Sequence, residues 1–194
     1  MDLNPKKSPV GCCIAVWPWG SYLGDQTVRV KISPYIRIHP RSTHADQKIC
    51  GHYINSIFAS CEAQREGYEE AVLLDYQGFI AEGPGENLFV IKDSEIQTPP
   101  LGNILPGITR DSIIALASDL GYEVKEVPLR VEDLKDADEA FFSGTAAEIT
   151  PISQIDDTSL PVARGEITRE IQEQFMGIVR GKNEQYLSWL TFVR

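Results

Sequence analysis

Short apolar segments separated by glycine-rich turns fill the middle of this sequence, and they restrict its fold more than any other feature. Three of them follow one another closely: EAVLLD (70–75), FIAEG (79–83) and NLFVIKD (87–93). Glycines stand in the turns between them, and apolar runs of this length bounded by turn residues are typical of β-strands. The sequence therefore predicts a group of neighbouring strands in its central third.

Further strands are predicted on both sides of this group. VGCCIAVW (10–17) has the character of a buried strand, and QTVRVKIS (26–33) and YEVKEVPL (122–129) alternate between apolar and polar residues. EAFFSGTAAEITPI (139–152) is predicted as a strand that enters a turn of small residues. TPPLGNILPG (98–107) is predicted as a loop, because proline and glycine interrupt it repeatedly.

Helices are predicted where apolar residues recur at helical spacing. They are expected at 53–66, 109–120, 131–137 and about 167–180. Gly67 and Gly121 are placed to end the first two, and Thr109 can cap the second. Because strands outnumber helices and occur in neighbouring groups, the prediction is an α+β fold in a single domain over residues 1–194.

Charge and cysteine usage narrow the class of function and the compartment. The 18 basic and 28 acidic residues give a formal net charge of −10, which argues against a nucleic-acid or anionic-membrane partner because both favour a basic surface. Cys12, Cys13, Cys50 and Cys61 show no metal-ligand spacing with the three scattered histidines. Free thiols predict a reducing, cytoplasmic compartment. The N-terminal residues fit neither a signal peptide nor a membrane span.

Lys48 and Glu82 are candidates for chemistry. Lys48 begins KICGHYINSI (48–57), a stretch of mostly small or apolar residues in which a strongly hydrated lysine is unusual. It is either a reactive amine or one more solvated surface charge. Glu82 follows the apolar GFIA (78–81), so it either points into the interior, where a carboxylate needs a partner, or ends a strand at the surface.

Two turns of small residues are candidates for anion binding. In LPGITRD (105–111) the backbone N–H groups of Ile108 and Thr109 lie at the positive end of the predicted helix, which suits a phosphate; the same pattern also describes an ordinary helix N-terminus. SGTAA (143–147) offers the Thr145 hydroxyl and closely spaced N–H groups, or is simply a tight turn. A reactive lysine, an interior carboxylate and a phosphate cradle are together the groups that pyridoxal phosphate requires.

The same motifs, in the same order, resemble a known family. KICGHYINSI, EGPGENLF (82–89), LPGITRD and SGTAAEITPI are similar to the class IV (fold type IV) pyridoxal-phosphate aminotransferases, and most closely to the branched-chain amino acid aminotransferases. The resemblance implies a large domain in which a pseudo-barrel of β-strands is surrounded by α-helices. It also implies that the family's smaller N-terminal domain is absent here, and hence weak cofactor binding and poor transamination by these 194 residues.

The resemblance assigns cofactor contacts to the motif residues. Lys48 is implied to form the Schiff base with pyridoxal 5'-phosphate and then to act as general base and acid. Glu82 is implied to pair with the pyridine nitrogen, and Tyr53 with the phenolic oxygen. The implied phosphate ligands are Ile108, Thr109 and Thr145.

The resemblance also implies the substrates. Thr145 and Ala146 would bind the substrate α-carboxylate, while Trp19 and Tyr22 would line an apolar side-chain pocket unless they are ordinary core aromatics. The implied reaction is transamination of leucine, isoleucine and valine with 2-oxoglutarate, in a homodimer or higher homo-oligomer. Two alternatives are a non-catalytic remnant that binds the cofactor or another phosphate-bearing ligand, and a class IV enzyme of other specificity. His52 stands where the family often has asparagine.

Overall fold

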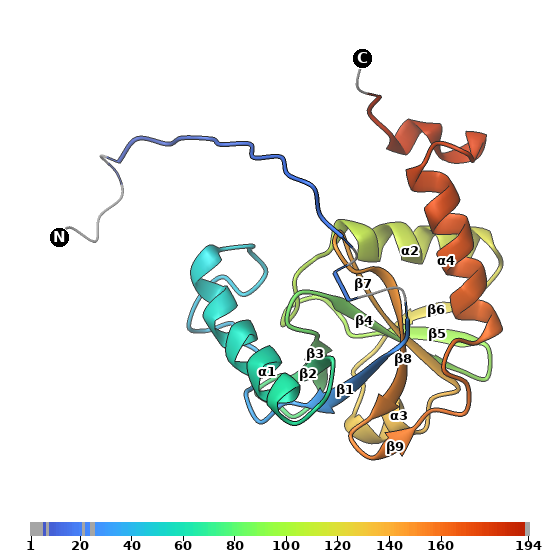
Figure 1. The fold of residues 1–194 in the computed structure, drawn as a ribbon, viewed down its shortest axis with the longest axis horizontal. Helices are drawn as coiled ribbons and strands as arrows, with labels where there is room; N and C mark the ends of the chain where they lie inside the picture. Colours follow the sequence, from blue (N-terminus) through green and yellow to red (C-terminus); the bar gives the residue numbers. More distant parts are fainter. Residues whose placement is uncertain (1–5, 7, 21, 24–25, 193–194) are drawn as a thin grey trace.

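A computed structural model of the chain describes residues 6, 8–20, 22–23 and 26–192, and in this part nine strands form one mixed sheet. The strands follow the order β3-β2-β1-β8-β7-β4-β5-β6, with β9 beside β8. Their bounds are β1 Val28–Ile32, β2 Glu70–Leu74, β3 Ile80–Glu82, β4 Asn87–Lys92, β5 Glu95–Thr98, β6 Val124–Glu126, β7 Glu139–Gly144, β8 Glu148–Ile155 and β9 Thr158–Ser159. The sheet is strongly curled into a half-barrel with helices around it (Figure 1), which confirms the predicted α+β class.

Alternation along the central strands explains why both faces of the sheet are buried. Successive side chains of a strand point to opposite faces. On β4, Leu88 and Val90 belong to one apolar cluster, whereas Phe89 and Ile91 belong to another that also contains residues of α2 and α4. The antiparallel pairing of β4 with β7 places Phe89 opposite Phe141, and their rings stack with centroids 4.9 Å apart.

Four α-helices surround the sheet in the described part of the chain. They are α1 Tyr53–Arg65, α2 Ile108–Asp119, α3 Val131–Lys135 and α4 Glu166–Val179, with short 3-10 helices at η2 Cys50–His52 and η3 Glu184–Trp189. α1 packs against β2, and α2 and α4 lie together against β7 (Figure 1). Gly67 and Gly121 adopt positive φ just beyond α1 and α2, as the predicted helix ends require. None of the helices in the described ranges has both the length and the apolar character needed to cross a bilayer.

Several local predictions need correction. The buried side of α1 consists of small residues, Ser56, Ala59 and Ala63, whereas the large apolar residues at helical spacing, Ile54, Ile57 and Phe58, are exposed. The N-cap of α2 is Gly107 rather than Thr109, so Thr109 lies inside the first turn. A strand over 95–98 was missed, because charged or polar residues flank its only large apolar residue, Ile96.

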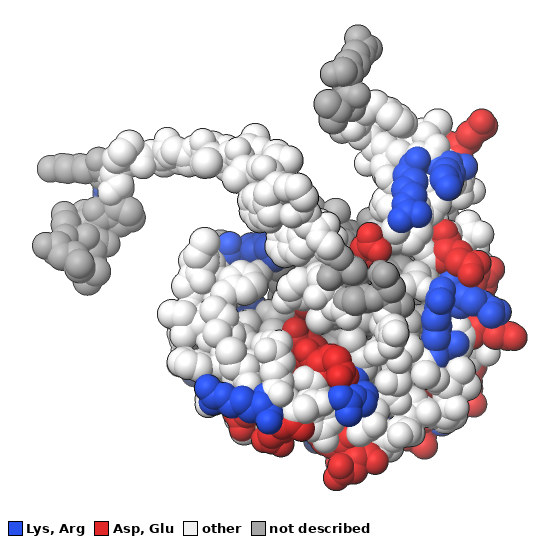
Figure 2. Space-filling model, in the orientation of Figure 1, with Lys and Arg blue, Asp and Glu red and all other residues white. Residues whose placement is uncertain are grey.

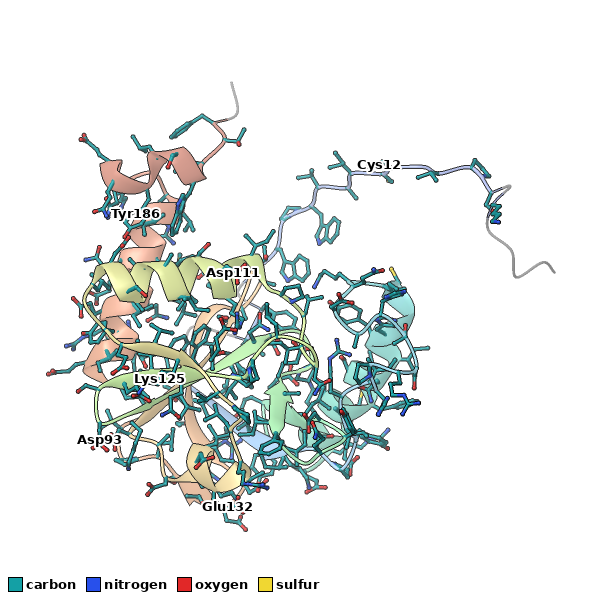
Figure 3. The ribbon with its side chains drawn as sticks, turned by 180° about the vertical axis from the view of Figure 1, so that it is seen from behind. Cys12, Asp93, Asp111, Lys125, Glu132 and Tyr186 are labelled. Atoms are coloured by element: carbon teal, nitrogen blue, oxygen red, sulfur yellow. The ribbon has the colours of Figure 1, made fainter. Side chains whose placement is uncertain are left out.

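The predicted buried strand at 10–17 is wrong. Residues 8–20, here called the N-terminal arm, form no strand, and the large apolar residues Val10, Ile14 and Val16 are exposed. The arm leads away from the sheet (Figure 1), carries no acidic or basic side chain (Figure 2), and places Cys12 far from the body of the domain (Figure 3). An apolar run predicts burial, but it does not say which surface provides it.

The N-terminus of α4 depends on a close contact between β7 and Gly165. Glu139, at the start of β7, accepts hydrogen bonds from the N–H groups of Ile167 at 3.3 Å and Thr168 at 2.8 Å. These are groups that have no partner within the helix. A Cβ added to the N-cap residue Gly165 would lie 1.9 Å from the Glu139 carboxyl carbon, so only glycine leaves room for this carboxylate.

Replacing Gly165 by alanine is therefore expected to displace Glu139 and to lower the free energy of unfolding by about 1–3 kcal/mol, through the lost cap and the steric clash. Gly177→Ala is the matched control, because a Cβ there meets nothing within 4 Å and the residue is inside α4. It should stabilise the domain by roughly 0.5–1 kcal/mol. Urea unfolding measures both; equal effects of the two variants would contradict this explanation.

Candidate active site

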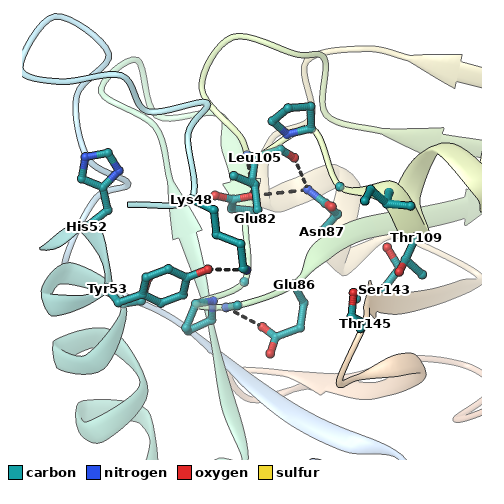
Figure 4. Close-up of a pocket in the computed structure, with 18 of the residues that line it drawn as sticks. Lys48, His52, Tyr53, Glu82, Glu86, Asn87, Leu105, Thr109, Ser143 and Thr145 are labelled. Carbon is teal, nitrogen blue, oxygen red and sulfur yellow. Dashed lines mark hydrogen bonds between the residues drawn. The ribbon is translucent and has the colours of Figure 1, made fainter. Parts of the chain in front are cut away.

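One cavity of about 310 Å³ collects six of the predicted site residues. It is lined by Lys48, Tyr53, Glu82, Ile108, Thr109 and Thr145. All of these except Ile108 are labelled in Figure 4. They come from the loop before η2, the start of α1, the end of β3, the first turn of α2 and the turn between β7 and β8. The volume lies at the lower end of the range of small-molecule sites, about 300–1,000 Å³.

Lys48 and Tyr53 face each other at one side of the cavity. Lys48 lies in irregular backbone and Tyr53 is the first residue of α1. The Lys48 Nζ donates a hydrogen bond to the Tyr53 hydroxyl at 2.5 Å and lies 5.1 Å from the centre of the tyrosine ring (Figure 4). The amine therefore stands at the cavity surface with a phenol beside it, an arrangement that suits proton exchange between amine, phenol and a bound molecule.

The Glu82 carboxylate is the centre of a buried hydrogen-bond network. Glu82 is only 5% exposed, and one of its oxygens accepts a hydrogen bond from Arg37 Nε. The other oxygen accepts from the Leu105 N–H at 3.0 Å and from the Asn87 amide at 3.3 Å. The Asn87 amide also donates to the Leu105 carbonyl at 2.9 Å (Figure 4). Of the two positions that the sequence left open for Glu82, the chain thus adopts the interior one.

Arg37 is the partner that makes burial of this charge tolerable. Its guanidinium forms an ion pair with Glu82, and both side chains are almost fully buried. Burial raises the pKa of the Glu82 carboxyl, while the charge of Arg37 and the Leu105 N–H act in the opposite direction. Glu82 also lines the cavity, and a carboxylate can accept about four hydrogen bonds, so a donor group of a ligand could still bind to it.

The opposite side of the cavity is a helix N-terminus with open N–H groups. No described side chain caps α2, so the N–H groups of Ile108 and Thr109 have neither an intrahelical partner nor a side-chain cap. A Cβ on Gly107 would lie 2.1 Å from the Asn87 side-chain oxygen, so glycine permits the close approach of this turn to β4. Ser143 adds a buried hydroxyl that has no hydrogen-bond partner among the described residues. Together these groups suit an anion.

Three predicted substrate residues lie outside this cavity. Trp19 and Ala146 line a second cavity of about 570 Å³. Tyr22 lies beside the wall of the first cavity: its hydroxyl would be 3.8 Å from a Cβ placed on Gly85. Burial, followed by the charge of Glu86, raises the pKa of the Tyr22 phenol to about 12. The substrate roles of these three residues remain predictions.

Arg37, Asn87 and Glu86 were missed as site residues. Arg37 lies in PYIRIHP (34–40), where alternating apolar residues hide a buried cation. Glu86 and Asn87 belong to EGPGENLF, and the available signal for them was a polar pair immediately before the apolar run LFVI (88–91). A buried polar residue next to a strand needs a partner, and both of these face the cavity.

Glu86 is a buried carboxyl that forms no ion pair with any described residue. It is 3% exposed, and the only hydrogen bond to its side chain in the described structure comes from the Gly85 N–H at 3.0 Å, which leaves the second oxygen without a partner. Burial, together with the nearby Glu70 and Glu82 carboxylates, raises the pKa of Glu86 to about 8. The neutral acid is therefore its main form at neutral pH.

This raised pKa makes stability depend on pH. The ordinary value of 4.5 applies in the unfolded chain and about 8 in the folded one, so stability is greatest below the former and is lost as the pH rises toward the latter. The loss is on the order of 1.4 kcal/mol per pH unit between the two values, and Glu86→Gln should remove it. Urea unfolding across this pH range tests it, with the exposed Glu173→Gln as control. Parallel profiles for Glu86→Gln and the unchanged protein would refute it.

This chain is similar to known aminotransferases over most of its length. The family profile described as "Amino-transferase class IV" matches residues 3–155. A branched-chain-amino-acid aminotransferase of Salmonella typhimurium is 45% identical, over 98% of this chain and 64% of the relative. The branched-chain aminotransferase of Thermoproteus uzoniensis, solved with norvaline, superposes with a TM-score of 0.88 at 46% identity, covering 91% of this chain and 59% of that one. The branched-chain amino acid aminotransferase of Thermobaculum terrenum in its PLP form gives a TM-score of 0.86 at 38% identity, covering 90% and 58%.

The chain thus spans somewhat less than two thirds of the length of the relatives it matches. The family match, in contrast, covers well over half of this chain and contains Lys48, Tyr53, Glu82, Thr109 and Thr145. The motifs that resemble the family are therefore the ones that meet in the cavity. This chain belongs to the class IV aminotransferases.

Proposed function

We propose that residues 1–194 form the large cofactor-binding domain of a pyridoxal-phosphate-dependent branched-chain amino acid aminotransferase. The observation that carries the proposal is the meeting of an amine, a buried carboxylate and an open helix N-terminus in one cavity, at Lys48, Glu82 and Ile108–Thr109. Relatives with 38–46% identity support the substrate class, since their names specify branched-chain amino acids.

The donors and acceptors of the cavity fit this cofactor. The uncapped first turn of α2 and the Thr145 turn can hold a dianionic phosphate through N–H and hydroxyl groups. Glu82, which is paired with Arg37, can accept a hydrogen bond from a protonated ring nitrogen. Tyr53 can donate to a phenolic oxygen while it contacts Lys48. The orphaned Ser143 hydroxyl is a further buried donor for which a ligand would provide a partner.

Lys48 carries the proton transfers in this proposal. When bound, pyridoxal phosphate supplies an aldehyde for the amine and a ring that takes up an electron pair. Once an amino acid substrate has taken the place of the lysine amine on the cofactor, the free Lys48 Nζ accepts the proton from the substrate Cα. It then gives the proton back on the same face of the bound molecule. Tyr53 keeps the amine at this position through its hydrogen bond. A single group therefore serves as base and acid.

The proposed substrate contacts lie in the turn between β7 and β8 and in or just after the N-terminal arm. Thr145 and Ala146 would bind the α-carboxylate through backbone N–H groups, and both are exposed at the end of β7. Trp19 and Tyr22 would surround an aliphatic side chain of leucine, isoleucine or valine, with 2-oxoglutarate as the amino acceptor. Because Trp19 lines a neighbouring cavity, this role requires the arm to approach the Lys48 side. A methylene in such a pocket contributes only about 1–3 kcal/mol to specificity.

Assembly and location belong to the same proposal. Exposed Ile54, Ile57 and Phe58 on α1 support a homodimer or higher homo-oligomer, since three large apolar side chains on one helix face favour cover by another surface. A cytoplasmic location rests on the four free cysteines.

Incubation with pyridoxal phosphate followed by borohydride reduction should attach one pyridoxyl group to Lys48, because among the described lysines it is the one that lines the cavity. Peptide mass spectrometry locates the label. Lys48→Arg should abolish it, whereas Lys125→Arg, at an ion-paired surface lysine, should not.

Label scattered over surface lysines would refute the cofactor assignment. Specific label on Lys48 without release of a 2-oxo acid from leucine or valine would instead favour a non-catalytic cofactor-binding role. Release from other amino acids would favour a different specificity.

Removal of Arg37 tests the role of Glu82. Arg37→Met leaves a buried carboxylate without its cation and should lower the free energy of unfolding by about 3–5 kcal/mol, whereas Arg37→Met/Glu82→Leu removes both charges and should recover most of that loss. Neither variant should retain pyridoxal phosphate as the unchanged protein does, because the ring nitrogen then lacks its ionised partner.

Urea unfolding gives the stabilities, and absorbance titration with pyridoxal phosphate gives the affinities. A double variant that binds the cofactor as tightly as the unchanged protein would show that Glu82 has no part in binding.

A further inference from the structure

His52 follows the candidate lysine by four residues. It is the last residue of η2 and the N-cap of α1, it lines the same cavity as Lys48, and it is 9% exposed. Within the described structure its side chain neither pairs with an acid nor bonds to Lys48. It bonds instead to the loop that precedes Lys48, which has no regular secondary structure.

The two ring nitrogens of His52 bind two points of that loop. Nδ1 lies 3.2 Å from the Gln47 carbonyl oxygen and Nε2 lies 2.7 Å from the Thr43 hydroxyl. A carbonyl oxygen only accepts, so Nδ1 carries the hydrogen and donates it to Gln47. In the neutral ring Nε2 then accepts from the Thr43 hydroxyl. Each polar atom of the buried imidazole is thus used.

The bond to Gln47 acts on Lys48 through the peptide bond between them. The Gln47 carbonyl and the Lys48 N–H belong to one planar peptide unit. A hydrogen bond that holds the carbonyl oxygen therefore also holds the orientation of this peptide plane, to which the Lys48 Cα is attached. The same oxygen accepts from the Ile49 N–H at 2.9 Å, and the His52 N–H donates to the Ile49 carbonyl at 3.0 Å. Lys48 therefore sits inside a small closed turn whose one side-chain member is His52.

The middle of the loop is held independently of His52. Arg37 donates to the Ala45 carbonyl at 3.0 Å while its Nε binds Glu82. Loop residues 43–47 are consequently held by Arg37 at Ala45 and by His52 at Thr43 and Gln47. Arg37 connects the loop to the Glu82 carboxylate by hydrogen bonds. His52 connects the loop to the start of α1, whose first residue, Tyr53, accepts the hydrogen bond from Lys48.

We propose that His52 is a positioning residue for Lys48: its Nδ1–H holds the Gln47 carbonyl, and so sets the direction in which the Lys48 amine enters the cavity. The proposal rests on the proposed role of Lys48 for its chemical consequence, but the loop geometry that it describes does not depend on any bound group.

Two substitutions separate the two hydrogen bonds. The asparagine amide nitrogen occupies nearly the place of Nδ1, so His52→Asn keeps the Gln47 bond and loses the Thr43 bond. The glutamine amide reaches the place of Nε2, so His52→Gln keeps the Thr43 bond and loses the other. His52→Ala loses both. His44→Ala is the matched control, because His44 lies in the same loop, is exposed and has no side-chain hydrogen bond in the described structure.

The first measurement is the rate at which pyridoxal phosphate becomes borohydride-trapped on Lys48. His52→Ala and His52→Gln should slow trapping roughly tenfold, since a small misplacement of a reacting group has effects of this size or larger. His52→Asn and His44→Ala should stay within about twofold of the unchanged protein. Equal rates for the asparagine and glutamine variants would overturn the proposal, as would an unchanged rate for His52→Ala.

The second measurement uses the protein without cofactor. Hydrogen–deuterium exchange at the Ile49 N–H, which donates to the same Gln47 oxygen, should accelerate in His52→Ala and His52→Gln but not in His52→Asn. Should trapping on Lys48 fail in the unchanged protein, the proposed function fails and exchange alone decides the positioning role. Unchanged exchange in the glutamine variant would then refute it. The asparagine–glutamine pair also decides the matter if His52→Ala does not fold.

Discussion

The buried ion pair between Arg37 and Glu82 is the interaction on which the candidate site depends. A carboxylate in the interior is tolerated only when its charge is compensated and its lone pairs are used. Here the network joins four separate parts of the chain: Arg37 after β1, Asn87 at the start of β4, Leu105 before α2, and, through Arg37, the Ala45 carbonyl in the Lys48 loop. Burying one charge thus fixes the relative positions of most segments that line the cavity.

The sheet explains why these segments can meet. Glu82 ends β3, at the edge of the sheet beyond β2, whereas Asn87 begins β4 on the other side of the β1–β8–β7 centre. Strong curling brings the two sides of this sheet back toward each other (Figure 1), so the short segment 83–86 is enough to connect the strands. This tight turn needs small residues, and a Cβ on Gly83 would lie 2.5 Å from the Glu86 carboxylate. Sheet curvature and turn composition are therefore part of the site.

Sequence reasoning recovered what local pattern encodes and missed what distant contacts decide. The strands of the 70–93 region, α4 and the glycine ends of α1 and α2 were predictable from apolar period and turn residues. The inner face of α1 was not, because its small residues pack on β2 while larger ones stay exposed, and periodicity alone favours the larger ones. The strand prediction for the N-terminal arm failed because large apolar residues are exposed there too. Lys48, Glu82 and Thr109 were candidates from their local sequence and from motif resemblance. Arg37 was not, since its partner Glu82 is 45 positions away in the sequence.

Glu82 and Glu86 show how the same residue type acquires two different states within one turn. Both are almost fully buried, and burial raises the pKa of each. Glu82 has a guanidinium and two N–H donors against this effect, whereas Glu86 has one backbone N–H and two carboxylate neighbours. The first is therefore suited to remain an acceptor for a positively charged group, and the second to remain a neutral acid. A second ionised carboxylate in this turn would compete with Glu82 for the charge of Lys48, which interacts with both. A neutral Glu86 does not compete in this way, so the electrostatic interaction of Lys48 with Glu82 is kept.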